Sequence, residues 1–265
     1  MPSIRRLSIL WLLVAAFCLR AGSAMAQLDM PAVARLDQLT ATPALAGELV
    51  YRGVVASTRA PAVPLFTYQR HVALAPAGVV ATHITSDLAG HVVVVESAEM
   101  SPAYSLVRFE AINRQLGSSG SVAVTQGGRH LEFRRTANGR VATASEDVRD
   151  PVVSGPSLHG FILARWDELA GDKPITVRMV VLNAMETYGF DIRRLAAKNG
   201  RATVTITPSN LLVRLAIAPL QVEFDAVTRK LLRYEGRVPP MQLVDGNLRD
   251  LDAGVDYRMV APAYR

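Results

Sequence analysis

The segment from Gly155 to Arg194 constrains the fold most, because its hydrophobic period changes there from that of a helix to that of strands. Apolar residues first recur at intervals of three and four, which places them on one side of an α-helix. These residues are Leu158, Phe161, Ile162, Trp166 and Leu169. β-Branched and aromatic residues then dominate 175–182 and 187–195, as is typical of strands. The pattern predicts an amphipathic helix over 157–170 that packs on a β-sheet.

Local signals bound this predicted helix. Ser154 is a candidate N-cap, and Pro156 suits the first turn, where a missing N–H does no harm. Gly171, followed by Pro174, is expected to end the helix. The helix therefore has defined ends as well as an apolar side.

Residues 1–26 have the pattern of a signal peptide that is cleaved before Gln27. Arg5 and Arg6 give a positive start, 7–19 is apolar, and Ala24-Met25-Ala26 has the small-x-small form of a cleavage site. The alternative is an uncleaved membrane anchor, but the apolar run is shorter than the ~20 residues that an anchor needs. The sequence thus predicts export to the periplasm of a protein that is not an integral membrane protein after cleavage.

Composition excludes several classes of function. Removal of 1–26 takes away three arginines and no acid, so the formal charge falls from +6 to +3. The remaining basic residues form no cluster, which excludes nucleic acid as a partner. Cys18 is the single cysteine and precedes the expected cleavage site, so the mature chain has neither a disulfide nor a reactive thiol. Stability must therefore come from burial.

Short strands joined by tight turns are predicted on both sides of the helix. The strongest turn signals are Asn138-Gly139 and Asn199-Gly200, because Asn-Gly favours the dihedral angles of a two-residue hairpin. Pro76-Ala77-Gly78 and 87–90 are further turns. Four consecutive valines, Val92–Val95, predict a strand with both faces covered. The predicted strands are 48–57, 65–74, 79–86, 91–98, 104–115, 121–125, 131–136, 140–145, 175–182, 187–195, 201–207, 210–218, 221–224 and 231–235.

These elements predict a mainly β (α+β) fold in one domain. The expected architecture is a large curved antiparallel sheet or open half-barrel, with one amphipathic helix packed on its concave side. The expected organisation is a signal peptide over 1–26, a lead-in segment over 27–47, the curved β domain over 48–238 with the helix at 157–170, and a C-terminal tail over 239–265 that packs on the domain.

No catalytic or metal-binding pattern is found. The sequence Gly155-Pro156-Ser157-Leu158-His159-Gly160 differs from a nucleophile elbow, because its second glycine comes one position late. No two histidines are spaced as a local ligand pair, although His83 and His91 flank a predicted turn. Glu96 and Glu99 are interpreted as solvated charges. We therefore predict no catalytic residue, no metal and no cofactor, and an enzymatic activity is not expected.

Aromatic residues near the helix are the remaining candidates for a binding site. They are Phe161 and Trp166 on the helix and Tyr188 and Phe190 on the strand that follows. One interpretation is that all four pack in the core. The other is that the curved sheet is only partly filled and that these residues line an apolar cleft.

Two sequence segments carry a resemblance. The first is the Gly155-Pro156 helix that ends in Trp166-Asp167-Glu168-Leu169-Ala170-Gly171, and the second is Val222-Glu223-Phe224-Asp225 with Thr228-Arg229-Lys230-Leu231 and Tyr234-Glu235-Gly236. With the signal peptide and the strand series, they make the chain similar to uncharacterised exported bacterial proteins whose sheets resemble the open half-barrels of the lipoprotein-localisation (LolA/LolB-like) carriers. The resemblance implies a periplasmic half-barrel with a helical lid, and it implies no catalytic residue.

The leading hypothesis is a periplasmic binding or chaperone-like protein for an apolar ligand, namely a lipid, an acyl group or a hydrophobic segment. The alternative is a structural or interaction protein of the cell envelope, with a fully packed core, no ligand and an envelope protein as partner. A hydrolase ranks third.

Overall fold

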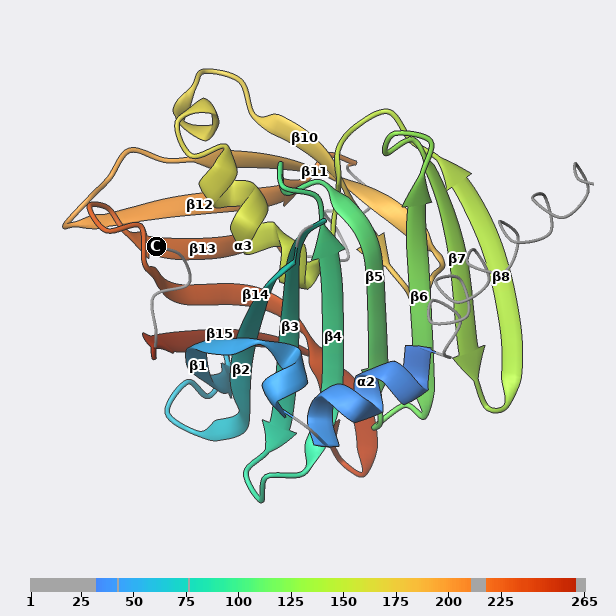
Figure 1. Ribbon diagram of the computed structural model, residues 1–265. Coiled ribbons are helices and arrows are strands. Elements are labelled where there is room, and N and C mark those ends of the chain that lie inside the picture. The colour runs from blue at the N-terminus through green and yellow to red at the C-terminus, as the bar shows by residue number, and fades with distance from the viewer. Residues whose placement is uncertain (1–31, 42, 76, 211–217, 261–265) are drawn as a thin grey trace, which may run out of the picture.

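The computed structural model describes residues 32–41, 43–75, 77–210 and 218–260, and its strands form one open sheet of 15 strands (Figure 1). Along the sheet their order is β8-β7-β6-β5-β4-β3-β2-β1-β15-β14-β13-β12-β11-β10-β9. Neighbouring strands are antiparallel, except that β9 and β10 are parallel. The predicted large, mostly antiparallel open sheet is therefore confirmed. The described part of the chain contains two α-helices.

The elements have the following bounds. The helices are α2 (Ala32–Ala41) and α3 (Gly155–Ala164), with the short 3-10 helices η1 (Pro43–Ala46) and η2 (Glu168–Ala170). The first half of the sheet contains β1 (Glu48–Ser57), β2 (Pro64–Ala75), β3 (Gly78–Asp87), β4 (Val92–Met100), β5 (Leu106–Asn113), β6 (Ser118–Thr125), β7 (His130–Ala137) and β8 (Arg140–Asp147). The second half contains β9 (Val152–Val153), β10 (Ile175–Val181), β11 (Glu186–Arg194), β12 (Arg201–Pro208), β13 (Leu220–Asp225), β14 (Leu231–Val244) and β15 (Asn247–Met259).

The connection between the two edge strands forces the sheet to curl. β8 and β9 lie at opposite edges of the sheet but follow one another in sequence, separated only by 148–151. So short a segment spans at most roughly 18 Å. Side chains also join β8 to β10 and β11 near the other edge, because the Glu146 carboxylate accepts hydrogen bonds from Arg178 Nη2 at 2.7 Å and from the Thr187 amide at 2.8 Å. The sheet therefore turns back on itself without strand pairing between β8 and β9 in the described chain.

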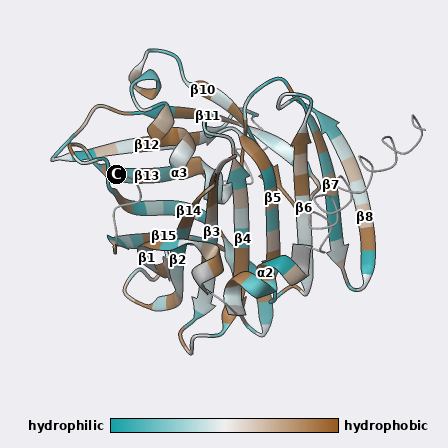
Figure 2. Cartoon of the chain, viewed as in Figure 1, coloured by the Kyte–Doolittle hydropathy of each residue, from teal (hydrophilic) through white to brown (hydrophobic). Residues whose placement is uncertain are grey.

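Helix α3 packs into the core that the two halves of the sheet share. Leu158, Phe161 and Ile162 are buried in one cluster with residues of β1 to β3 and of β10 to β14. Gly160 allows close packing, since a Cβ at this position would lie 2.3 Å from Cδ1 of the Tyr104 ring. The hydropathy of the strands alternates along their length (Figure 2), as expected when only one face of each strand is buried.

Helix α2 packs on the other face of the first half of the sheet. Its Leu36 is fully buried against Ile84, Val95 and Ile112 of β3, β4 and β5. Successive side chains in a strand point to opposite faces, so Val94 and Glu96 face away from α2. Because Val94 and Val95 are both buried, the prediction that this strand has two covered faces is confirmed.

The helix predicted over 157–170 is shorter and divided. Its predicted N-cap, Ser154, is confirmed, and the Ser154 amide donates to Ser157 Oγ at 2.8 Å. The helix ends at Ala164, and η2 follows after a short break. Arg194 Nε donates to the Trp166 carbonyl at 2.9 Å, which holds the chain in the break. This contact comes from a distant strand, so the helical periodicity does not reveal it.

The predicted hairpin turns are confirmed, but the prediction that the C-terminal segment is a tail is wrong. Asn138, Gly139, Asn199 and Gly200 all have positive φ, as the predicted turns require. Residues 239–259, in contrast, extend β14 and form β15 in the middle of the sheet, where a packed tail was expected. Strand β14 tolerates two successive prolines because its pairing is irregular between 238 and 242. The strand expected at 210–218 lies largely outside the described residues, and so does the signal peptide expected over 1–26.

Replacement of Trp166 by alanine should lower the free energy of unfolding by ~3–5 kcal/mol. The Trp166 side chain is 5% exposed, and its ring makes an edge contact with Phe224 at 5.2 Å between centroids. Urea unfolding followed by circular dichroism measures the loss. Val227→Ala is the control, since Val227 is 88% exposed and should change the free energy by less than about 0.5 kcal/mol. Equal stability of both variants would remove Trp166 from the core.

Candidate functional site

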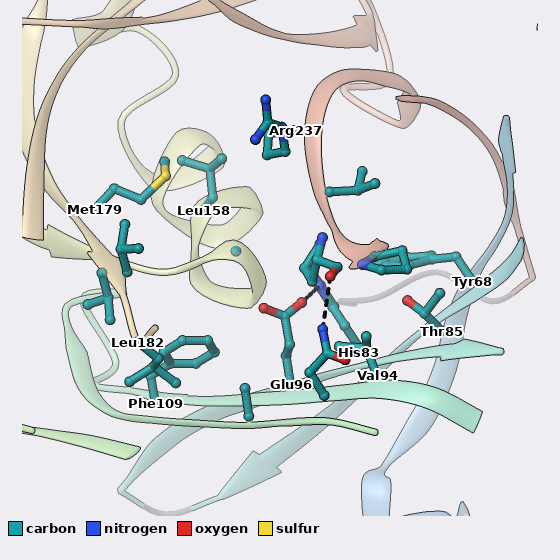
Figure 3. Close-up of a pocket in the computed structure, with 18 of the residues that line it drawn as sticks. Tyr68, His83, Thr85, Val94, Glu96, Phe109, Leu158, Met179, Leu182 and Arg237 are labelled. Carbon is teal, nitrogen blue, oxygen red and sulfur yellow. Dashed lines mark hydrogen bonds and ion pairs between the residues drawn. The ribbon is translucent and has the colours of Figure 1, made fainter. Parts of the chain in front are cut away.

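A cavity of about 480 Å³ lies between the two halves of the curled sheet and beside helix α3. Figure 3 shows two different ends to this cavity. Phe109, Met179 and Leu182 lie at the apolar end, and Tyr68 and Thr85 lie at the other end. Ionisable side chains lie between them. The cavity thus has an apolar part next to a polar part.

Three ionisable residues line the cavity from neighbouring strands at the same level. In the antiparallel pairing, Arg70 of β2 is opposite His83 of β3, and His83 is opposite Glu96 of β4. Directly opposed residues in a sheet present their side chains on the same face. The register therefore brings Arg70, His83 and Glu96 together, although 13 residues separate each from the next in sequence.

Arg70 is the largest fully buried polar side chain of the described residues, with 1% of its surface exposed. Its Nη1 approaches His83 Nε2 at 2.6 Å and donates to the Pro156 carbonyl of helix α3 at 2.9 Å. The guanidinium therefore ties the start of α3 to the sheet. An arginine always donates, so His83 Nε2 must accept and the His83 proton resides on Nδ1.

Glu96 is neutral at acidic pH because it is buried. Burial raises the pKa of the Glu96 carboxyl to about 7. Burial and the positive charge of Arg70 both lower the pKa of His83, so that ring is neutral as well. His83 Nδ1 lies 3.9 Å from Glu96 Oε2. The two groups form no ion pair below neutral pH, because both are neutral there. The interpretation of Glu96 as a solvated charge was wrong, because its strand is covered on both faces.

His159 of helix α3 completes the polar part of the cavity. The ring stacks on Phe224 at 5.9 Å between centroids and meets the edge of Tyr51 at 5.8 Å. Burial, followed by the charge of Arg70, lowers the pKa of His159. Neither ring nitrogen has a hydrogen-bond partner.

Tyrosines close the polar end. The Tyr68 ring contacts His83 at 4.9 Å and Tyr257 at 5.4 Å between centroids. Burial is the main cause that raises the pKa of Tyr68, Tyr234 and Tyr257, so all three hydroxyls stay protonated. Among Arg70, the two histidines, Glu96 and these tyrosines, the Arg70 guanidinium is therefore the charged group below neutral pH.

The four aromatic residues predicted from the sequence do not form one site. Phe190 lines the cavity. Phe161 and Trp166 are buried in the main core cluster, and Tyr188 packs against that cluster while its hydroxyl donates to Glu186 at 2.6 Å. The predicted binding role of the three residues outside the cavity lining stays a prediction.

The sequence contained a signal for the polar cluster that local motif searches do not use. Pro76-Ala77-Gly78 lies midway between Arg70 and His83, and the turn at 87–90 lies midway between His83 and Glu96. An antiparallel hairpin pairs residues that lie at equal distances in sequence from its turn. The positions of the two turns therefore place the three residues side by side. His83 does not meet His91, whose ring instead contacts the Asp87 carboxylate at 3.0 Å.

The cavity in the described chain shows no paired nucleophile and base. Nucleophilic catalysis needs a hydroxyl within hydrogen-bond distance of a base. In the described chain, no serine or threonine hydroxyl is hydrogen-bonded to His83, His159 or Glu96, and Ser157 bonds only within the helix start, to Ser154. Across the same residues, no group of three or more His, Cys, Asp or Glu side chains is arranged to hold a metal ion. None of the described helices is long and apolar enough to span a bilayer.

Comparisons with known proteins give little guidance. The sequence matches no known protein family and no curated protein. Among solved structures, a porin-like protein from Bacteroides uniformis is similar over 80% of this chain and 96% of that chain, with 8% sequence identity and a TM-score of 0.20. A similarity of this degree carries no functional argument.

The buried Glu96 should make stability depend on pH. Its pKa is higher in the folded state, so the folded protein retains the proton longer and its stability falls as pH rises from the unfolded value of about 4.5 through about 7. Glu96→Gln should remove this fall. At pH 8 the variant should be more stable than the parent by up to about 3 kcal/mol, with a much smaller difference at pH 4.

Urea unfolding at the two pH values measures this effect. Glu48→Gln serves as the control, because the Glu48 side chain is exposed at the start of β1 and should change stability little at either pH. A stability difference between parent and Glu96→Gln that does not vary with pH would contradict the burial of an unpaired carboxyl at this position.

Proposed function

We propose that the protein binds an apolar ligand, such as a lipid, an acyl group or a hydrophobic segment, in the cavity between the two halves of its sheet. The cavity of about 480 Å³ is the observation that carries this proposal. Ligand pockets usually have volumes of about 300–1,000 Å³ and are lined by apolar side chains with a few polar groups. A protein of purely structural role, with a fully packed core, has no need of such a space.

The lining supports an apolar ligand in particular. Three of the strands contribute Phe109, Met179 and Phe190, and helix α3 contributes Leu158 and Ile162. In this proposal α3 is the roof on the concave side of the sheet, and the ligand lies beneath it. The Arg70 bond to the Pro156 carbonyl fixes the start of that roof.

The sequence adds a cellular setting. The signal peptide expected over 1–26 would deliver the chain to the periplasm, where an apolar molecule needs a carrier to cross an aqueous space. The resemblance to lipoprotein-localisation carriers agrees with this role and is part of the proposal. We infer a binding or chaperone-like protein of that compartment.

A neutral hydrophobic dye, N-phenyl-1-naphthylamine, tests the proposal. The dye should bind saturably to the purified protein with increased fluorescence. Ala111→Phe should weaken the binding by at least about tenfold, because Ala111 lines the cavity opposite Glu96 and a phenyl group would fill that space.

The control is Ala142→Phe, which makes the same change on the exposed edge strand β8 and should leave dye binding unaltered. Thermal unfolding of both variants verifies that they are folded. Absence of saturable binding, or equal binding by folded Ala111→Phe and the parent, would refute a ligand site in this cavity and favour the structural alternative.

A further inference from the structure

The Arg70 guanidinium has one satisfied side and one unsatisfied side. Nη1 is engaged by His83 and by the Pro156 carbonyl. Nε and Nη2 make no hydrogen bond of good geometry, although the Tyr68 hydroxyl lies within reach of the guanidinium and its interaction with Arg70 lowers the pKa of Tyr68 against the larger effect of burial. Buried polar groups are rarely left unpaired, because the loss of hydration costs about 1–3 kcal/mol or more for a charged group. The unpaired side therefore needs an explanation.

The two free atoms form the side edge of the guanidinium. Their N–H bonds run parallel, and this spacing matches the two oxygens of a carboxylate in a bidentate pair. Arg70 also lines the cavity, so a ligand in the cavity can reach this edge. The two donors of the free edge match a planar acceptor with two oxygens better than a single carbonyl oxygen.

The charge at this end of the cavity is not balanced. In the described chain, no carboxylate lies within ion-pair distance of Arg70. Glu96 is protonated at acidic pH because burial raises its pKa to about 7, and His83 and His159 are neutral because burial and Arg70 lower their pKa. A buried cation without a counter-charge is costly, and one negative charge on a ligand would offset it.

His159 provides a second unpaired group beside the first. It lines the same cavity, it is 8% exposed, and both of its ring nitrogens lack partners. A neutral imidazole carries one N–H, which can donate to a carboxylate oxygen. His159 lies about one helical turn beyond Pro156, whose carbonyl accepts a hydrogen bond from Arg70 Nη1 at 2.9 Å.

We propose that the ligand is an amphiphile with a carboxylate head, such as a free fatty acid, whose two oxygens accept hydrogen bonds from Arg70 Nε and Nη2, with His159 beside them. The inference rests on the proposed function and specifies its ligand. The acyl chain extends toward the apolar end at Phe109, Met179 and Leu182. One carboxylate charge offsets the one positive charge of Arg70, whereas a dianionic phosphate head would bring a second negative charge to that guanidinium.

Three ligands with the same twelve-carbon chain and different head groups distinguish the contribution of the head group to the affinity from that of the acyl chain. Dodecanoate, dodecanol and dodecyl phosphate are titrated into the protein by calorimetry at about pH 6, where a free carboxylic acid is ionised and Glu96 is mostly protonated. Dodecanoate should bind about tenfold to a hundredfold more tightly than dodecanol, as expected for hydrogen bonds to a charged group. Dodecyl phosphate should bind more weakly than dodecanoate, because at this pH about half of its head groups carry a second negative charge.

Substitution of Arg70 locates the head. Arg70→Met should bind dodecanoate no better than dodecanol, so the ratio of the two affinities should fall to about one. The control is Arg135→Met, since Arg135 also lines the cavity and its Nε is also unpaired. That variant should keep the preference for dodecanoate. Arg70→Lys, which keeps the charge but lacks the parallel donors, should lose most of the preference.

A stability measurement separates binding from a structural role. Without ligand, Arg70→Met should stay folded with a cooperative transition in urea, because removal of a buried uncompensated charge offsets the loss of the bonds to His83 and the Pro156 carbonyl. If Arg70→Met fails to fold, Arg70 is structural, and the preference of folded Arg70→Lys decides: retention of the full preference by this variant would overturn the inference.

The outcomes distinguish this inference from the proposed function. Equal binding of dodecanoate and dodecanol by the parent would overturn the carboxylate site and leave an apolar binding protein. Tighter binding of dodecyl phosphate would overturn the carboxylate in favour of a phosphate head. Loss of the preference in Arg135→Met but not in Arg70→Met would place the head elsewhere. Binding of neither dodecanoate nor dodecanol would overturn both proposals.

Discussion

The short link between β8 and β9 is the constraint on which the rest of the structure depends. Fifteen strands form one sheet, and the four residues 148–151 join its two edges. An extended sheet of this width cannot satisfy that link, so it must turn its apolar face inward upon itself. The Glu146 bonds to Arg178 and Thr187 also connect β8 to β10 and β11, which lie next to the other edge. The order of the strands therefore brings the two halves of the open sheet to face one another.

How that interior is filled decides what the protein can bind. Helix α3 begins immediately after β9, so the chain enters the interior at the place where the edges meet. Its apolar side chains complete the core of one region, and the remaining space is the cavity. The Arg70 guanidinium couples the two, because one of its nitrogens holds the helix start and two others are left free beside the cavity. A buried charge thus serves the fold and the candidate site together.

Local physical chemistry made much of this fold predictable. The Asn138-Gly139 turn, the Ser154 cap and the valine run at 92–95 follow from backbone preferences or from coverage of a strand, and the structure bears them out. The aspartates after 239 indicate contact with solvent, which is compatible with a tail. In β15, however, Asp250, Asp252 and Asp256 alternate with the buried residues Leu251, Ala253 and Val255, so the same pattern describes a strand with one solvent-exposed face.

The candidate site was harder to predict because long-range pairing creates it. The aromatic residues near α3 were chosen for their closeness in sequence, and only Phe190 lines the cavity. Arg70, His83 and Glu96 meet through the register of three strands, and His159 joins them from a helix. The positions of the predicted turns determine that register. Burial favours the protonated form of Glu96 and separates Arg70 from any carboxylate of the described chain. It cannot be predicted from the sequence until the buried face of each strand is known.

The proposal that the cavity holds an amphiphile is testable by native mass spectrometry of the protein purified from the cell without detergent. We expect a non-covalent adduct of one molecule per chain, which is released on unfolding and has the mass of a long-chain carboxylic acid. A spectrum that shows the bare chain alone, from protein that is folded and shields its interior, would contradict the account.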